Sequence, residues 1–314
     1  MSSSLNWTVS DSPLAAFTQT QLDAIAQKAQ AQALEGQLPD YIPLLAQANP
    51  TGLAVQLQFR DGQIYTVGDV TLSFPLMSAI KPFVLLFLLE QLGTQAVFER
   101  VGMEASLEPF NSLNQLEADG GWPRNPMLNS GAIVLASLLP GQDAQSRCES
   151  LRHWLNQRSN RHLFLHEPML SSVRKGRSES NRAIAKKLVQ EGYLDAVESA
   201  LDTYNHVCCL SGTVTDLASL GMLLVQTQGA IKAEHRRTVT ALMSTCGLYQ
   251  ASFRFAVQVG LPTKSGVSGA MVAVMPRQGA IACYSPPLDR EGNSVAGLFV
   301  LQQLAQTLDL SLFG

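Results

Sequence analysis

The alternation of apolar and polar residues predicts two strands in the first quarter of the chain. Residues 53–59 alternate between the two kinds of side chain, Asp61 and Gly62 supply a turn, and residues 63–67 resume the extended pattern. Alternation of this kind is typical of a half-buried strand, and Asp-Gly is a strong turn signal between two strands. The segment therefore predicts a β-hairpin.

The middle of the chain has the longer periodicity of helices. The apolar run at residues 83–89 predicts a buried helix, fed by a loop, within residues 74–92. Residues 179–191 and 213–228 predict two further helices, and the second begins with a Thr-x-x-Asp capping pattern. A glycine, which commonly ends a helix, follows each segment. These glycines are Gly93, Gly192 and Gly229.

From residue 253 onward, the pattern again predicts strands. Residues 253–259, 269–275 and 280–284 are three extended segments, separated by turns rich in glycine and proline. A final helix is expected over residues 294–308. The chain therefore has predicted strands near both ends.

This order of elements indicates the fold class. Strands at both ends with helices between them favour an α+β fold, in which distant segments complete one antiparallel sheet flanked by helices. We expect a single domain over residues 1–314, with a helical lobe at roughly residues 82–245. A cleft between the sheet and the lobe is the expected place for functional groups.

Composition narrows the class of protein. Hydrophobic residues make up 46% of the 314 residues and charged residues 15%, and the formal net charge is −3. Nucleic-acid binding requires a concentrated basic surface, so we expect no nucleic-acid partner. One basic cluster is interleaved with acidic residues and has no aromatic neighbours, which is typical of a solvated helix face. Its members are Arg174, Lys175, Arg177, Arg182, Lys186 and Lys187.

Three further features predict a soluble cytoplasmic protein without a membrane partner. The apolar run at residues 83–89 is far shorter than the roughly 20 residues that span a bilayer. Residues 1–13 are polar and carry no export signal. The five cysteines include the vicinal pair Cys208 and Cys209 and have no regular disulfide spacing, which suits a reducing compartment.

Ser78 and Lys81 are the sharpest local indication of chemistry. A spacing of three residues places both side chains on one face of a helix, and Pro82 is tolerated only in a first turn, so the helix is expected to begin near Ser78. Burial would lower the pKa of Lys81, and the neutral amine could then take the hydroxyl proton of Ser78. Penicillin-recognising enzymes use the same Ser-x-x-Lys arrangement, although the pattern alone is weak.

A second motif lies in the last quarter of the chain. Lys264, Ser265 and Gly266 precede the probable strand at residues 269–275. In penicillin-recognising enzymes a Lys-Thr-Gly triplet on a cleft-bordering strand supplies a cation and a backbone N–H. The two motifs in this order predict a serine acyl-transfer site.

The remaining candidates for chemistry are interpreted as structural. His162 and His166 stand four residues apart, which is a possible metal-ligand spacing, but Pro168 follows closely and no third ligand is evident. A surface pair is therefore favoured, and we expect no metal and no cofactor. Cys208 and Cys209 are expected to pack as core thiols.

A more specific resemblance rests on a series of short segments that match a known family in order. These segments run from Tyr41 to the last helix, which is most of the chain. The sequence resembles the serine-dependent glutaminases of bacterial and mitochondrial type. The matching segments are residues 40–43, 68–69, 78–81, 100–104, 110–113, 125–133, 246–249, 259–267, 285–289 and 292–297. The resemblance implies a fold like that of β-lactamases and transpeptidases.

The resemblance also implies catalytic roles. Ser78 would be the nucleophile, Lys81 its base, and Tyr249 the group that passes a proton to the leaving ammonia. The backbone amides of Ser78 and Val267 would form an oxyanion hole, which often contributes several kcal/mol. The implied reaction is hydrolysis of L-glutamine to L-glutamate and ammonia through an acyl-Ser78 intermediate.

Four further positions match the substrate-binding residues of the family. Tyr41, Asn129, Asn181 and Tyr204 would hold the α-carboxylate and α-amino groups of glutamine. Neutral amides and hydroxyls suit a zwitterionic substrate because they can contact both charged ends. The family often forms homodimers or homotetramers, which we expect here.

One departure from the family pattern affects the substrate end. Seven residues before Asn181 the pattern has a glutamate that pairs with the substrate ammonium, and this chain has Arg174. Arg174 would repel the ammonium, point away, or recruit a carboxylate. Glu167 and Glu179 are candidates to compensate. Met77 also stands where glutamine is usual.

Two other functions stay open at this point. One is a penicillin-recognising hydrolase or peptidase with the same pair of motifs, although such enzymes usually work outside the cytoplasm. The other is a binding module that kept the cleft and lost catalysis, for which Arg174 is the reason.

Overall fold

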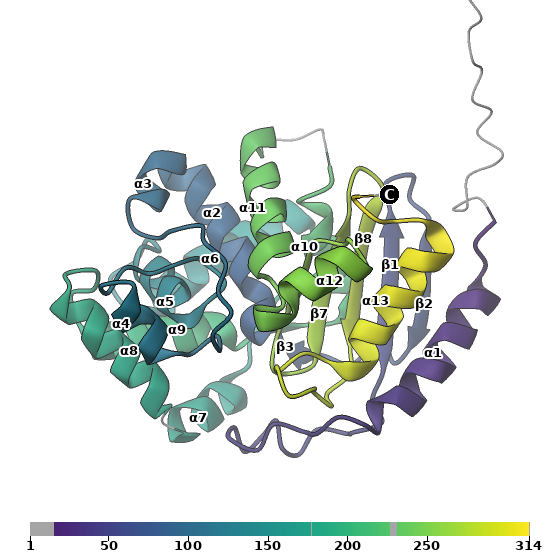
Figure 1. Cartoon of the computed structure of the whole chain (residues 1–314), viewed down its shortest axis with the longest axis horizontal. Coiled ribbons are helices and arrows are strands. Elements are labelled where there is room, and N and C mark those ends of the chain that lie inside the picture. Colours follow the sequence, from purple (N-terminus) through teal and green to yellow (C-terminus); the bar gives the residue numbers. More distant parts are fainter. Residues whose placement is uncertain (1–15, 177, 227–230, 314) are drawn as a thin grey trace, which may run out of the picture.

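The computed structural model describes residues 16–176, 178–226 and 231–313. Its main element is a five-stranded antiparallel sheet in the order β2-β1-β8-β7-β6. The strands are β1 (Ala54–Phe59), β2 (Ile64–Gly68), β6 (Thr263–Ser265), β7 (Ala270–Met275) and β8 (Gly279–Tyr284). The amino-terminal hairpin thus completes a sheet whose other strands come from the end of the chain (Figure 1).

Helices cover both faces of this sheet (Figure 1). On one face, α1 (Gln19–Ala33) packs along α13 (Val295–Leu308), and on the other α10 (Val214–Met222) lies against β1, β7 and β8. Every residue of β7 and β8 is buried, which explains their nearly continuous apolar sequences. Alternate strand residues therefore join two different cores, one on each side of the sheet.

A helical lobe occupies the middle of the chain, beside the sheet (Figure 1). It also contains a small sheet in the order β3-β5-β4, made of β3 (Phe74–Pro75), β5 (Leu210–Gly212) and β4 (Phe164–Leu165). The helices of the lobe are α2 (Lys81–Leu92), α3 (Thr94–Phe98), α4 (Leu113–Ala118), α5 (Asn129–Ser137), α6 (Ala144–Ser159), α7 (Glu167–Gly176), α8 (Glu179–Gln190), α9 (Val197–Cys208) and α11 (Ala233–Cys246).

Most of the predicted elements are confirmed. The hairpin has a regular antiparallel register in which Leu57 pairs with Tyr65. At the start of α10, the Thr213 hydroxyl and the Asp216 carboxylate cap each other's backbone N–H groups, as the capping pattern predicted. Ser294 caps α13 in a similar way. The predicted extent of this helix, residues 213–228, is wrong, because α10 ends at Met222 and turns follow. Gly229 lies outside the described residues.

The prediction of a strand over residues 253–259 is wrong, because this segment forms the helix α12 (Ser252–Gln258). Phe253 is 49% exposed and Val257 is 88% exposed, whereas Phe255 and Val259 are buried. The two exposed residues are four apart, and so are the two buried ones. Apolar residues that alternate over seven positions also include pairs four residues apart, and such pairs lie on the same face of a helix. The short pattern is therefore compatible with a helix as well as a strand.

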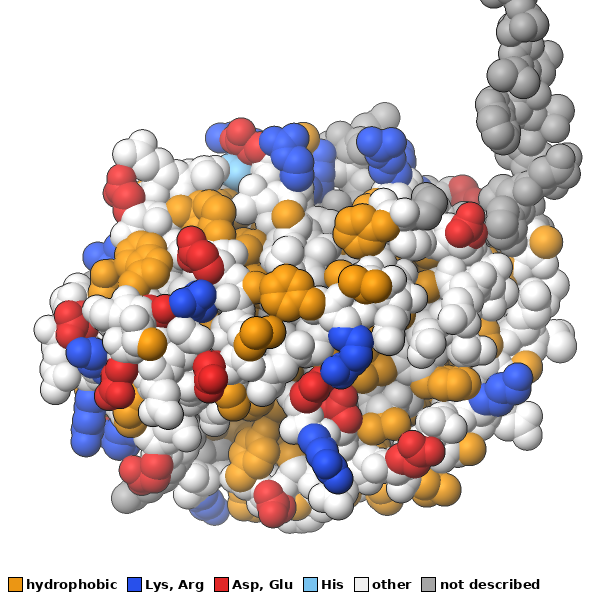
Figure 2. All heavy atoms as spheres, viewed as in Figure 1, with side chains coloured by type: hydrophobic (Ala, Val, Ile, Leu, Met, Phe, Trp, Pro, Cys, Tyr) orange, Lys and Arg blue, Asp and Glu red, His pale blue; other side chains and the backbone are white. Residues whose placement is uncertain are grey.

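The surface charges, the cysteines and the helix lengths bear on the interpretation of the composition. On the face shown in Figure 2, basic and acidic side chains are interspersed and form no concentrated basic patch. All five cysteines are buried and free. No helix in the described ranges is long and apolar enough to cross a membrane. Those ranges also contain no cluster of three or more histidine, cysteine or acidic side chains that could hold a metal ion.

Candidate active site

Ser78 lies in a tight turn between β3 and α2. A 3-10 turn, η2 (Met77–Ile80), leads directly into α2, so the regular helix begins at Lys81 rather than at Ser78. Met77 has a φ of 47°, in the left-handed region that side chains rarely adopt. Such a conformation costs about 1–3 kcal/mol and is typical of functional sites. Pro82 fits because it occupies the first turn of α2.

Lys81 is buried beside this turn, with only 3% of its surface exposed. Its Nζ donates hydrogen bonds to the Met127 carbonyl at 2.9 Å and to Asn129 Oδ1 at 2.8 Å. Burial lowers the pKa of Lys81 to about 8, because the charged form loses its hydration. Burial thus makes the neutral amine easier to form than in an exposed lysine, in the direction expected from the sequence.

The Lys264, Ser265 and Gly266 motif lies against the Ser78 turn. A Cβ on Gly266 would stand 2.5 Å from the Leu76 carbonyl oxygen and 3.2 Å from the Ser78 nitrogen, so only glycine permits this approach. The Ser265 hydroxyl donates to Asn293 Oδ1 at 2.6 Å, which fixes the strand end. The motif therefore borders the turn as predicted.

Lys264 is fully buried and holds the backbone around the site. Its Nζ donates to the Gly247 carbonyl at 2.9 Å and to the Ser265 carbonyl at 2.6 Å. It also lies 4.3 Å from the ring centroid of Tyr249. Burial lowers the pKa of Lys264 well below its usual range, and the positive charge of Lys81 lowers it further.

Tyr249 reaches the same turn from η3 (Tyr249–Ala251). Its φ of 57° also lies in the left-handed region, and its ring packs 4.6 Å from that of Phe110. Burial raises the pKa of Tyr249 to about 12, and a hydrogen bond with Ser78 opposes this shift. The phenol is therefore a protonated group, and its hydroxyl donates to the Ser265 carbonyl at 3.5 Å, beside the Ser78 turn.

The backbone amides of Ser78 and Val267 are available to a ligand. Gly266 brings the two chain segments together, and Val267 lines the same pocket as Ser78. Within the described part of the chain, neither N–H donates to a protein acceptor. Two unpaired N–H groups that face one pocket could bind an oxyanion.

Asn129, Asn181 and Tyr204 form a neutral polar cluster next to Ser78. Asn129 Nδ2 donates to Asn181 Oδ1 at 2.7 Å, and the Tyr204 hydroxyl donates to Asn129 Oδ1 at 3.1 Å. Burial is the main reason that the pKa of Tyr204 lies well above its usual range. Tyr41 is half-exposed and lines the same pocket. The structure thus brings all four predicted substrate-binding residues to one cavity.

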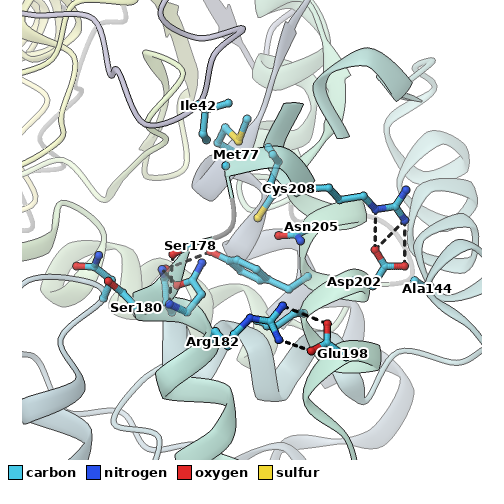
Figure 3. Close-up of a pocket in the computed structure, with 18 of the residues that line it drawn as sticks. Ile42, Met77, Ala144, Ser178, Ser180, Arg182, Glu198, Asp202, Asn205 and Cys208 are labelled. Carbon is cyan, nitrogen blue, oxygen red and sulfur yellow. Dashed lines mark hydrogen bonds and ion pairs between the residues drawn. The ribbon is translucent and has the colours of Figure 1, made fainter. Parts of the chain in front are cut away.

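This pocket has a volume of about 1270 Å³ and lies between the Ser78 turn and helices α7, α8 and α9 (Figure 3). Lys81 lies behind its wall, with Cys208 in the same region. Two ion pairs that the sequence analysis missed line the pocket (Figure 3). They join Arg174 to Asp202 and Arg182 to Glu198, and each connects separate helices, so no local sequence signal indicates them.

Arg174 recruits a carboxylate, one of the three outcomes expected for it. Its Nε and Nη2 donate to Asp202 Oδ1 at 2.9 and 2.7 Å, and Nη2 also donates to Oδ2 at 3.0 Å. Of the two acids expected to compensate, Glu179 lines the main pocket, whereas Glu167 lines a separate hollow beside Arg174. The basic cluster is thus partly paired with acids.

His166, Cys208 and Cys209, which were interpreted as structural residues, have the following surroundings. His166 Nδ1 accepts a hydrogen bond from the Met169 N–H at 3.0 Å, so it caps the start of α7. Burial raises the pKa of Cys208 to about 11, although the charge of Lys81 opposes this shift. Cys208 is therefore a thiol packed in the core, like Cys209.

The antiparallel sheet, its flanking helices and the cleft-bordering motifs define a β-lactamase-like α+β protein. A family model described as glutaminase matches residues 36–313. The chain therefore belongs to the glutaminase family and is a hydrolase.

Individual relatives agree with this assignment. A glutaminase of Synechocystis sp. is 43% identical over 293 residues, which cover 93% of this chain and 90% of the relative. The solved structure of a probable glutaminase, YbaS, has a TM-score of 0.87 at 34% identity, covering 95% of this chain and 99% of that one.

A further solved structure shows a relative in a covalent complex. It contains the Bacillus subtilis glutaminase YbgJ bound to 5-oxo-L-norleucine, formed by reaction with 6-diazo-5-oxo-L-norleucine. This structure has a TM-score of 0.84 at 31% identity and covers 94% of this chain and 99% of that one.

Proposed function

We propose that this protein hydrolyses the side-chain amide of L-glutamine through an acyl-Ser78 intermediate. Neutral Lys81 takes the proton of the Ser78 hydroxyl, and Oγ attacks the amide carbon. The amides of Ser78 and Val267 stabilise the oxyanion. The observation that carries the proposal is the buried Lys81 amine, with its lowered pKa, one helical turn from Ser78 in a member of the glutaminase family.

Tyr249 would complete the acylation half of the reaction. Its hydroxyl bonds to the Ser265 carbonyl beside the Ser78 turn and stays protonated, because burial raises its pKa to about 12. It can therefore give a proton to the departing amide nitrogen, which leaves as ammonia, and recover one from Lys81. Water then attacks the acyl group, with Lys81 as base, and releases glutamate and free Ser78.

The Asn129, Asn181 and Tyr204 cluster would bind the α-carboxylate. Asn129 Oδ1 already accepts from Lys81 and Tyr204, and Asn181 Oδ1 accepts from Asn129. The side-chain N–H groups of Asn181 are then left to donate hydrogen bonds to an anion. Tyr41 would cover the substrate from the open side of the pocket.

Ammonia release from glutamine by the wild type and by Ser78→Ala tests the proposal. The variant is expected to lose at least about 10⁴-fold in kcat, because the nucleophile is removed. Ser219→Ala is a matched control, since Ser219 is buried in α10 and bonds to Gln58 and Arg161 instead of the pocket. Equal turnover by wild type and Ser78→Ala would reject the mechanism.

The penicillin-recognising alternative has a separate test, because a chromogenic β-lactam is expected to be inert with this protein.

Residues on both sides of the helical lobe, Ser78 and Val267, line one pocket, which supports a single catalytic domain over residues 1–314. A cytoplasmic location and a homodimeric or homotetrameric assembly stay predictions. Light scattering of the purified chain would measure the assembly.

A further inference from the structure

A second hollow, with a volume of about 810 Å³, adjoins the Ser78 pocket. Tyr41, Phe110 and Val267 line both spaces, so their side chains form the wall between them. The rest of its lining comes mainly from the end of α1, the first half of α13 and the turn at residues 288–292. These two helices lie side by side (Figure 1). The hollow therefore borders the reaction centre from the part of the molecule that carries the sheet.

Tyr249 lies directly behind this wall. Gly292 lines the second hollow next to the Tyr249 ring. A Cβ at this glycine would stand 3.6 Å from Phe110 Cε1, 3.7 Å from Tyr249 Cε2 and 3.9 Å from Val267 Cγ1. These are ordinary contact distances, so the glycine leaves space for about one methyl group beside the phenol. Because ammonia is about as large as a methyl group, the wall has an ammonia-sized gap next to the proposed proton donor.

The turn that carries Gly292 is fixed to the reaction centre by hydrogen bonds. Asp289 Oδ1 accepts from the N–H groups of Glu291 and Asn293, both at 2.9 Å. Asn293 Oδ1 in turn accepts from the Ser265 hydroxyl at 2.6 Å. The gap is therefore held by a network that also fixes the end of β6.

The charges of the second hollow favour a small cation. Acids outnumber bases among its charged lining residues, which are Glu35, Asp289, Arg290 and Glu291. Glu291 pairs with Arg254 at 2.9 Å, whereas in the described part of the chain Asp289 has no ion pair. Burial raises the pKa of Tyr249, and the charge of Asp289 raises it further, so this carboxylate acts on the phenol. Such a field attracts ammonium and repels the carboxylates of glutamine and glutamate.

The order of product release in the proposed reaction gives this hollow a use. Ammonia leaves when the C–N bond breaks, while the glutamyl group is still bonded to Ser78 Oγ. That group would extend to the polar cluster of Asn129, Asn181 and Tyr204, which lines the main pocket and not the second hollow. The nitrogen would instead depart beside Tyr249, at the gap in the wall.

On the basis of the proposed function, we propose that the second hollow is the exit for ammonia, separate from the main pocket through which glutamine enters and glutamate leaves. Its ligand class is ammonia and amines of similar size. The reverse of ammonia release follows the same path, so a small amine reaches the acyl-Ser78 group from this side. With hydroxylamine, the nitrogen attacks the acyl carbon and the bond to Ser78 Oγ breaks. The γ-glutamyl hydroxamate then leaves, and a proton of the amine passes to Oγ.

Capture of the acyl group by hydroxylamine tests this inference. Leu298→Cys places a thiol in the second hollow, and the five native cysteines are buried, so a methanethiosulfonate attaches a blocking group at one site of the folded protein. The ratio of hydroxamate to glutamate measures amine access and does not depend on the rate of acylation. Adducts of increasing size are expected to lower this ratio, by at least about fivefold for the largest, which corresponds to a barrier of about 1 kcal/mol. A reducing agent removes the adduct and should restore the ratio.

Ser199→Cys is the matched control, because Ser199 lines the main pocket and not the second hollow. Its adducts are expected to leave the ratio at the value of wild type treated in the same way. An unchanged ratio with the largest Leu298→Cys adduct, or a lowered ratio with a Ser199→Cys adduct, would overturn the inference. So would ammonia release from glutamine by the wild type without any hydroxamate. Those results leave the proposed function intact, whereas no ammonia release from glutamine would reject both.

Discussion

Two buried lysines, Lys81 and Lys264, stand near each other and have different surroundings. Lys264 donates to two backbone carbonyls and contacts the ring of Tyr249, so it holds the strand end and the phenol in place. Lys81 instead contacts Asn129 and lies one turn from Ser78. Burial lowers the pKa of both lysines, and the positive charge of Lys81 lowers that of Lys264 further, which suits Lys81 to act as a base.

The dependence of activity on pH follows from Lys81. Because its pKa is lowered to about 8, the neutral form increases as the pH rises through this value. We therefore expect kcat/KM for the amide substrate to rise between about pH 7 and pH 9, as the base loses its proton. Initial rates of ammonia release across this range measure the effect.

Lys81→Arg provides the complementary control. A guanidinium stays charged at every accessible pH, so this variant is expected to lose about 10²–10⁴-fold in activity without a rise between pH 7 and pH 9. A wild-type profile that falls over this interval would contradict the assignment of Lys81 as the base.

Residue spacing could predict the groups that are close in sequence, but not their conformations or distant partners. Ser78 and Lys81 share a turn, so a four-residue motif was sufficient to find them. The left-handed backbone of Met77 and Tyr249 has no such signal, because neither residue type favours it. Asp202 pairs with Arg174 from another helix, and no spacing rule links the two.

At the scale of elements, the contact between β6 and η2 determines the shape of the site. Gly266 allows the strand end to approach the backbone of Leu76 and Ser78. The same contact brings Val267 to the pocket that Ser78 lines. Residue patterns predicted a helix near Ser78 and a strand at residues 269–275, after the Lys264, Ser265 and Gly266 motif, but not the short strand β6 itself. The family resemblance implied the meeting point of the two segments. Hydrophobic periodicity alone does not indicate which loops touch.

Gly266→Ala tests this contact. The added Cβ would stand 2.5 Å from the Leu76 carbonyl oxygen, so one of the two segments must shift. A misplacement of about 1 Å can cost 10²-fold in rate, and we expect a loss of about that size in kcat. The measurement is steady-state kinetics with a parallel thermal unfolding curve. Full activity with a normal melting temperature would show that the close approach is unnecessary.

The segment at residues 253–259 shows where element prediction fails. Its apolar residues satisfy both a two-residue and a four-residue repeat, so the pattern alone does not distinguish a strand from a helix. Packing decides the outcome, since Phe255 and Val259 join the core beneath α12. Contacts with distant segments therefore decide between helix and strand, and a window of seven residues does not contain them.

At the scale of the whole molecule, the two faces of the sheet pack against different parts of the protein. The face under α1 and α13 packs a core that includes Leu57, Met271 and Leu301, and no residue of this core lines the pocket of Ser78. The opposite face packs against α10 and the helical lobe, which carries Lys81 and Asn129. Substitutions on the two faces should therefore have separable effects.

Leu301→Ala is expected to destabilise the fold without changing catalysis. Leu301 is fully buried in α13, and truncating such a leucine typically costs about 2–5 kcal/mol. Denaturant unfolding measures the loss, and KM for the substrate should stay at the wild-type value. Leu312→Ala is a control, because Leu312 is 43% exposed and should change stability little. A large change in KM would show that this face is coupled to the pocket.

The position of β1 has a consequence for how the protein is made. β1 lies between β2 and β8, and Ala54 pairs with Tyr284 near the opposite end of the chain. In a nascent chain, the hairpin therefore has an unpaired edge until β8 has been synthesised. An exposed strand edge invites association with other chains. Slow synthesis or truncation upstream of β8 is thus expected to produce aggregates, and a chaperone that binds the waiting hairpin would raise the yield.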